Sequence, residues 1–384
     1  DKLHFSAQYS RVSDSEYFKE IARTNIDIKT LKSHIKLTYD DEENNLSAAL
    51  LTEDQQIVNE GVPIYTRALE ASLSKTFIID TNQREKNDAE IDAEIERQLY
   101  EQAKGTSGEI AAEKIYNKVK IESWKYPSTS LSVNLSSTKF NHDDVTKESG
   151  VRTNGNFEIS RPFAVKFPKI TPKANVNITN YSLKNSNNIN RTILGSGLDI
   201  DFTVIIPTSM FGYQANHRIT PLISYNYRAK KVQGNIPIFD TEDKYTDIIT
   251  FADLTSGERY TGLDRITNAN DITLSLESSY RAIDAIDDDK DLLNMRIAQS
   301  FYTDDEVVSD TANSNYETRK SYSDIAASID VALGKYVISS SAQFNPDTSK
   351  LVKKENSLTY TSNSRKFITL SVSDEGTKET EKLY

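Results

Sequence analysis

Hydrophobic and polar side chains alternate along most of the chain, which is the period-2 pattern typical of β-strands. The longest run extends from Leu194 to Ile206, and we interpret it as one strand that ends at Pro207. Shorter runs begin near residues 3, 69, 131, 223, 272, 293, 325, 336 and 368. Because successive side chains of a strand point to opposite faces, each segment is expected to have one apolar and one polar face.

Two architectures produce such segments: a sandwich with a solvated outer face, and a membrane barrel with lipid outside and a polar lumen inside. The segments run over roughly 8–12 residues, which suits a tilted membrane strand better than a short strand of a soluble protein. Polar connectors of unequal length separate them, such as residues 40–45 and 284–291. Short turns that alternate with long polar loops favour a large antiparallel transmembrane β-barrel.

One segment has a helical period instead. Over residues 85–120, Ile91, Ile95 and Leu99 recur every four residues, and Gly105 separates them from a second, looser stripe. This pattern predicts a helical hairpin inserted in a loop between two strands. No linker divides the rest, so we expect residues 1–384 to be part of a single barrel domain.

Composition and motifs remove several classes of function. The chain has 46 Lys and Arg against 57 Asp and Glu, a net charge of −11 that argues against a nucleic-acid binder. It contains no cysteine, which excludes disulfides, thiolate metal sites and a cysteine nucleophile within this segment. No apolar run approaches the ~18 residues of a membrane helix. The four histidines lie far apart, and there is no G-x-S-x-G motif, so we predict no enzyme, cofactor or metal site.

The segment 259–273 (RYTGLDRITNANDIT) differs from the other loops. It resembles the G-x-D-R-I-x-x-A-N stretch of the family of the lipopolysaccharide-assembly protein LptD, also called organic solvent tolerance protein. Residues 1–18, 221–240 and 295–303 resemble other stretches of the same family, in the same order. The resemblance therefore covers nearly the whole chain.

This resemblance implies a very large barrel in the outer membrane of a Gram-negative bacterium. It implies a lipoprotein partner, LptE, that plugs the lumen, and a periplasmic bridge including LptA that supplies lipopolysaccharide through a jelly-roll domain. The pair would deliver lipopolysaccharide to the outer leaflet without a covalent step. The jelly roll and the first and last barrel strands are expected to lie outside this chain, which would be the central part of the barrel.

The family stretch also supplies the candidate site. We expect Gly262 to permit a turn, and Asp264, Arg265, Asn268 and Asn270 to form a hydrogen-bonded knot that orders a loop at the lumen rim. An equally weighted alternative is a turn with a structural role only.

Two other functions stay open. A general porin-like channel would have the same alternation, but the polar run 374–382 does not look like the aromatic terminal strand of a porin. A soluble extracellular β-sandwich adhesin would need regular turn signals and two similar inner faces, which fits the long strands and loops less well.

Overall fold

A computed structural model gives the fold of this chain. It describes residues 2–13, 30–58, 64–79, 97–98, 100–101, 104, 128–164, 168–244, 248–282, 291–304, 321–363, 366–375 and 378–383. Most of the predicted helical insertion at 85–120 lies outside these residues. Arg97, Gln98, Tyr100 and Glu101, which lie inside them, are helical.

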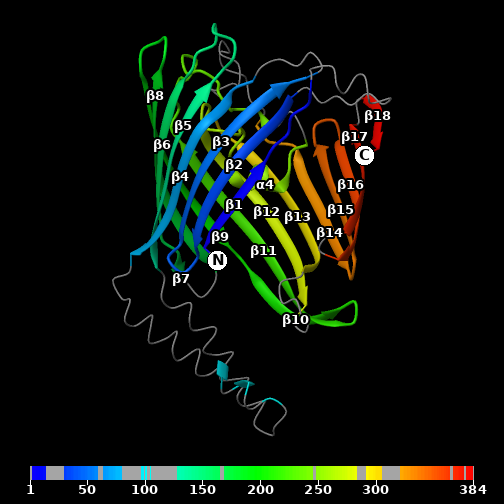
Figure 1. Ribbon diagram of the computed structural model, residues 1–384. Helices are drawn as coiled ribbons and strands as arrows, with labels where there is room; N and C mark the ends of the chain where they lie inside the picture. The colour runs from blue at the N-terminus through cyan, green and yellow to red at the C-terminus, as the bar shows by residue number, and fades with distance from the viewer. Residues whose placement is uncertain are drawn as a thin grey trace.

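The described chain is a large antiparallel β-barrel wall in which every strand belongs to one 18-stranded sheet (Figure 1). The strands are β1 (Leu3–Gln8), β2 (Thr30–Asp41), β3 (Leu46–Ile57), β4 (Thr66–Ile79), β5 (Thr129–Asn141), β6 (Gly150–Ser160), β7 (Phe163–Ala164), β8 (Lys169–Leu183), β9 (Ile189–Asp201), β10 (Val204–Met210), β11 (Tyr213–Arg228), β12 (Ala269–Ala282), β13 (Asp291–Tyr302), β14 (Ile325–Leu333), β15 (Tyr336–Asn345), β16 (Lys350–Asn363), β17 (Lys366–Glu375) and β18 (Lys378–Leu383). One short helix, α4 (Phe251–Ser256), lies between β11 and β12.

Neighbours in sequence are neighbours in the sheet, with two local exceptions. The short strand β7 pairs with β8 beside the β6–β8 ladder, and β10 pairs with β11 beside the β9–β11 ladder. At the two ends of the order, β1 pairs with β2 and β18 pairs with β17. The sheet is therefore a meander of hairpins that curves around a lumen, as predicted for a barrel.

The prediction of one strand over Leu194–Ile206 is wrong. The strand breaks between β9 and β10, where the Asp201 carboxylate accepts hydrogen bonds from the backbone N–H and the hydroxyl of Thr203. Such a local bond competes with the ladder. Pro207, predicted to end a strand, instead lies inside β10 and pairs with Asn216 of β11.

The apolar faces of the strands point outward, the reverse of a soluble protein. Ile223, Leu274 and Ile297 lie on three adjacent strands and are 37%, 44% and 45% exposed. Between them in sequence, Ser224 and Thr273 are buried on the opposite, lumen side. An apolar surface of this kind is stable against lipid, and the polar face then lines the lumen.

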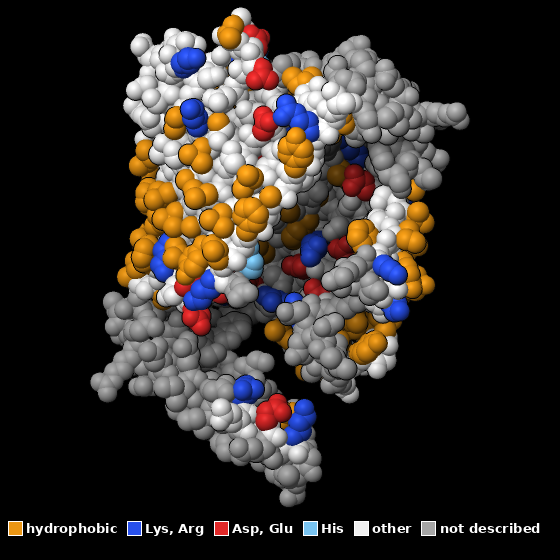
Figure 2. Space-filling view, viewed as in Figure 1, with side chains coloured by type: hydrophobic (Ala, Val, Ile, Leu, Met, Phe, Trp, Pro, Cys, Tyr) orange, Lys and Arg blue, Asp and Glu red, His pale blue; other side chains and the backbone are white. Residues whose placement is uncertain are grey.

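The space-filling view shows the same separation (Figure 2). Apolar side chains cover the outer surface of the strands at the left of the view, whereas Lys, Arg, Asp and Glu side chains appear inside the hollow. Within the described residues, no helix is both long and apolar enough to span a membrane.

Candidate functional site

The long connection from β11 to β12 folds into the lumen over its described residues, 229–244 and 248–268, and we call it the lumen loop. On one side Ile236 and Phe239 pack in a cluster with Phe140 of β5 and Tyr181 of β8. On the other side Leu254 of α4 packs in a cluster with Ala298 and Ala326, on the inner faces of β13 and β14. The lumen loop therefore touches two separate parts of the barrel wall.

The short helix α4 is defined by its ends. Thr250 and Asp253 form a capping box, in which each side chain accepts from the backbone N–H of the other. Gly257 ends the helix in the left-handed region, with φ of 66°. The Ile249 N–H donates to Gln343 Oε1 of β15 at 3.0 Å, which fixes this end of the lumen loop to the wall.

Asp264 is the centre of the contact with the other wall, and its side chain is completely buried. One carboxylate oxygen accepts from the backbone N–H groups of Phe239 and Asp240, at 2.7 and 3.0 Å. The second accepts from Arg152 Nη1 at 2.8 Å and from the Tyr181 hydroxyl at 3.2 Å. A single carboxylate thus joins two parts of the lumen loop to strands β6 and β8.

Arg152, on the lumen face of β6, binds two carboxylates. Its two terminal nitrogens donate to both oxygens of Asp240, at 2.6 and 2.8 Å, in addition to the bond with Asp264. The guanidinium also lies over the ring of Phe140, 4.9 Å from the centroid. Planar bidentate pairing of this kind fixes geometry as well as charge.

Arg191, on β9, binds the same loop mainly through backbone carbonyls. Its terminal nitrogens donate to the carbonyls of Leu263 and Asp264 at 2.6 and 3.0 Å, and to the side chains of Gln233 and Thr179 at 2.6 and 2.9 Å. Arg152, Tyr181, Arg191, Asp240 and Asp264 together form what we call the docking network.

Gly262, which we expected to permit a turn, has a left-handed backbone conformation. Gly262 has φ of 62°, and a Cβ added there would lie 2.3 Å from the Asp240 carboxylate and 2.6 Å from its carbonyl oxygen. Glycine is required at this position for two independent reasons, the backbone conformation and the close approach of the Asp240 chain.

The other predicted residues are distributed over two places. Arg265 and Asn268 are buried in the lumen loop, and Arg265 donates to the carbonyls of Asp264 and Ile236. Asn270 instead lies on β12, where its side chain accepts from the Tyr225 hydroxyl at 3.0 Å and its carbonyl accepts from Thr303. The structure therefore brings Gly262, Asp264, Arg265 and Asn268 together in one loop and places Asn270 at the start of the next strand.

The two loop carboxyls differ electrostatically. Burial raises the pKa of the Asp264 carboxyl above its ordinary value, although Arg152 opposes this effect. Burial also acts to raise the pKa of Asp240, but there the Arg152 guanidinium dominates and the pKa is lowered. The ion pair with Arg152 thus holds Asp240 in its charged form.

Sequence reasoning missed Arg152, Tyr181 and Arg191, the wall half of the docking network. Only Arg152 has a recognisable setting, because the next two lumen positions of β6 are Asn154 and Asn156. Arg191 lies between Ile189 and Ile193 on the same face of β9, so no polar pattern marks it. An arginine beside asparagines on the polar face of β6 is the signal that could have indicated a partner in the lumen.

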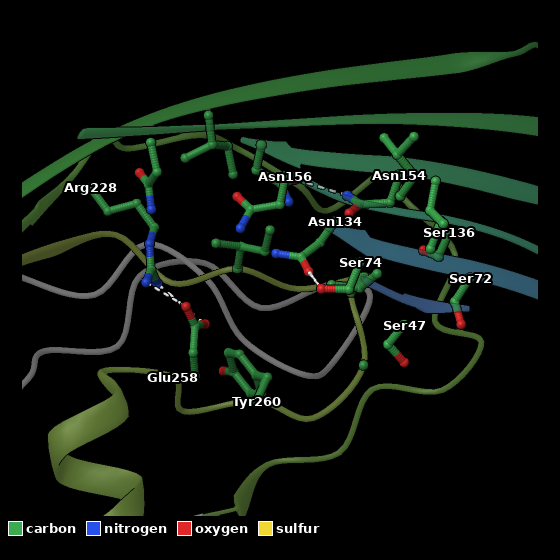
Figure 3. A pocket seen from close by; sticks show the side chains of 18 residues that line it. Ser47, Ser72, Ser74, Asn134, Ser136, Asn154, Asn156, Arg228, Glu258 and Tyr260 are labelled. Atoms are coloured by element: carbon green, nitrogen blue, oxygen red, sulfur yellow. Dashed lines mark hydrogen bonds and ion pairs between the residues drawn. The ribbon is translucent and has the colours of Figure 1, made fainter. Parts of the chain in front are cut away.

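Between the lumen loop and the barrel wall lies a cavity of about 440 Å³, which we call the polar chamber. Its wall carries five asparagines and four serines from β3, β4, β5, β6 and β8: Asn134, Asn154, Asn156, Asn175, Asn177, Ser47, Ser72, Ser74 and Ser136. Facing them are Arg228 at the end of β11 and Glu258 and Tyr260 of the lumen loop (Figure 3). Among the residues described, no group of three or more His, Asp or Glu could hold a metal ion.

Comparison with known proteins gives the family. The family model "LptD: LPS transport system D" matches residues 113–377. LPS-assembly protein LptD of Pseudoalteromonas atlantica is 32% identical over 151 residues, which are 39% of this chain and 18% of the relative. LPS-assembly protein LptD of Shewanella frigidimarina is 30% identical over 187 residues, 48% of this chain and 23% of the relative.

Among solved structures, a mutant of the ferric enterobactin receptor PfeA from Pseudomonas aeruginosa overlaps 90% of this chain and 50% of its own. The identity is 10% and the TM-score is 0.32, so this overlap adds nothing to the assignment. The chain spans only about a fifth of the length of the curated relatives named above. Because the family model matches more than half of the chain, the chain belongs to the LptD family, whose members transport and assemble lipopolysaccharide in the outer membrane of Gram-negative bacteria.

Proposed function

We propose that this chain is the central barrel wall of a translocon that delivers lipopolysaccharide to the outer leaflet. The observation that carries the proposal is the separation of faces in a chain of this family: apolar side chains outside, polar and charged side chains inside. Lipopolysaccharide joins a hydrophilic saccharide to a fatty base. A polar lumen spares the saccharide hydroxyls the cost of entering hydrocarbon without partners.

The proposal includes the partners that the family resemblance implies. A lipoprotein plug similar to LptE would occupy lumen that this chain leaves open. A periplasmic bridge similar to LptA would supply lipopolysaccharide through the jelly-roll domain of the complete protein. Transport of this kind breaks no bond, so we propose no enzymatic step.

The tight turns at one end of the barrel support an orientation. The connections 42–45, 211–212 and 334–335 are short and lie at one end, which also carries the long connection 80–128 from β4 to β5, whereas the lumen loop enters from the other end. Outer-membrane barrels have short turns on the periplasmic side and longer loops outside. The lumen loop would then cover part of the lumen from the cell surface.

Within this function, Gly262, Asp264, Arg265 and Asn268 would order the lumen loop, and Asn270 would fix the start of β12. The support is the burial of Asp264, Arg265 and Asn268, the left-handed backbone at Gly262, and the bonds of Asp264 to both the loop and the wall. Arg265→Ala tests this role. This variant should impair barrel assembly or retention of the plug. Normal assembly and normal retention would instead support the alternative, in which the segment is a turn with a structural role only.

The function itself is tested on the complete protein. Its depletion should reduce lipopolysaccharide at the cell surface, and a copy with an intact barrel should restore it. The protein extracted in mild detergent should carry a small lipoprotein in equal amount. A bare monomer or a trimer that conducts small solutes would instead favour the general channel.

A further inference from the structure

The polar chamber has an unusual composition for a buried lumen site. Five asparagine and four serine side chains line it, and the charged residues among its lining are Arg228 and Glu258 alone. These two are already paired, with Arg228 Nη2 2.5 Å from Glu258 Oε1. The chamber therefore offers many neutral hydrogen-bonding groups and no unpaired charge among its lining residues.

The polar side chains form an ordered row rather than a random lining. Strand register places Ser47 opposite Ser74, Ser74 opposite Asn134, Asn134 opposite Asn156, and Asn156 opposite Asn177. Adjacent strands lie about 4.8 Å apart, so the row presents amide and hydroxyl groups at regular intervals across β3, β4, β5, β6 and β8.

Across the cavity, the lumen loop supplies the opposite side. Tyr260 and Glu258 come from the loop, and Figure 3 shows them facing the row of strand side chains. A ligand in the chamber would thus lie between a hydrogen-bonding sheet face and the lumen loop. Amides can both donate and accept, which matches the hydroxyls of a saccharide.

We propose that the polar chamber binds uncharged saccharide units and excludes phosphorylated ones. This inference rests on the proposed transport of lipopolysaccharide and adds a preference for one part of it. A phosphate in the chamber would find the Arg228 guanidinium already neutralised by Glu258. One further carboxylate lies close by, because Glu158 is the register partner of Asn175. A buried anion without a paired cation is costly, so neutral sugars are favoured.

The test measures binding of soluble probes to the complete protein in detergent, together with its plug. The probes are a neutral glucose oligosaccharide and its phosphorylated analogue. Wild type should bind the neutral probe and show weaker binding of the phosphorylated one. Loss of two neutral hydrogen-bonding groups in the double variant Asn134→Ala, Asn156→Ala should weaken neutral binding about tenfold.

The matched control is Asn294→Ala on β13, which lies on a different part of the lumen wall and donates to Glu277 Oε1 at 3.0 Å. It should leave binding unchanged. Glu258→Gln should have the opposite effect, because it frees Arg228: binding of the phosphorylated probe should increase about tenfold. Equal binding of both probes to wild type, or no gain in Glu258→Gln, would overturn the inference.

A cellular assay separates this inference from the transport function. The double variant should display a truncated lipopolysaccharide without neutral outer sugars as well as wild type does, and display the full-length form more slowly. Equal display of both forms would overturn the saccharide preference and leave transport intact. Failure of wild type to display either form would refute the transport function itself.

Discussion

Replacement of Arg152 by methionine should release the lumen loop from the wall of β6. The guanidinium makes three charge-assisted hydrogen bonds, of 2.6, 2.8 and 2.8 Å, to Asp240 and Asp264. Removal of one partner of a buried pair costs about 3–5 kcal/mol. We expect the lower limit, because Asp264 keeps two backbone N–H groups and the Tyr181 hydroxyl. Methionine keeps an unbranched apolar stem beside Phe140.

Hydrogen exchange at the Phe239 and Asp240 amides is the direct assay, since both donate to Asp264. A loss of about 3 kcal/mol should accelerate their exchange about 100-fold if they exchange by local opening. Addition of Asp240→Asn should recover part of the protection, because it removes one of the two carboxylates left without Arg152. The reasoning would be refuted by unchanged exchange at these two amides.

The control for this variant is Arg296→Met on β13. Arg296 pairs with Glu277 and Asp330 at 3.1 and 3.4 Å, and its side chain is 34% exposed. Pairs of this kind contribute up to about 1 kcal/mol. Exchange at Phe239 and Asp240 should therefore change by less than about fivefold.

Three further predictions concern the loop and the membrane face. Gly262→Ala should release the lumen loop to trypsin, whereas Gly334→Ala, at a φ of 58° with open space around it, should cost only about 1 kcal/mol. Protection of the lumen-loop amides from hydrogen exchange should fall as pH drops below about 4, because Asp240 has a lowered pKa and its stabilisation is lost on protonation. Asp240→Asn should reduce this acid dependence when exchange is measured against pH. Leu274→Arg on the outer face should destabilise the barrel by about 2–4 kcal/mol, and Ser275→Arg on the lumen side should cost less, measured by heat-modifiable migration after folding into vesicles.

The sequence was sufficient to predict the faces of the strands. Every strand has one face toward lipid and one toward the polar lumen, and successive side chains alternate between them. The alternation around residues such as Leu274 and Ile297 is therefore enough to predict their direction. The break at Asp201 and Thr203 was missed because a side chain that bonds its own backbone leaves the alternation intact. The period-2 alternation therefore predicts which face a side chain lies on, but it does not predict where the hydrogen bonding between strands is interrupted.

Only the loop residues of the candidate site could be predicted from the sequence, and their partners on the barrel wall could not. Gly262 and Asp264 belong to one short motif, so their turn could be predicted from the need for glycine. The partner of Asp264, Arg152, lies 112 residues away in the chain, and no local pattern links the two. Asn270 was grouped with the loop because the motif is continuous, but the strand β12 begins at Ala269 and separates it from Asp264.

The two attachments of the lumen loop also set an order of assembly. Its bonds reach back to Arg152 and forward to Gln343, separations of 112 and 94 residues. Contacts of such long range form slowly, because the chain between them must be ordered first. The loop can dock completely only when β6 and β15 already stand in one curved sheet. Its docking would then be a late event in folding. A docked lumen loop would indicate that the barrel wall from β6 to β15 has already formed.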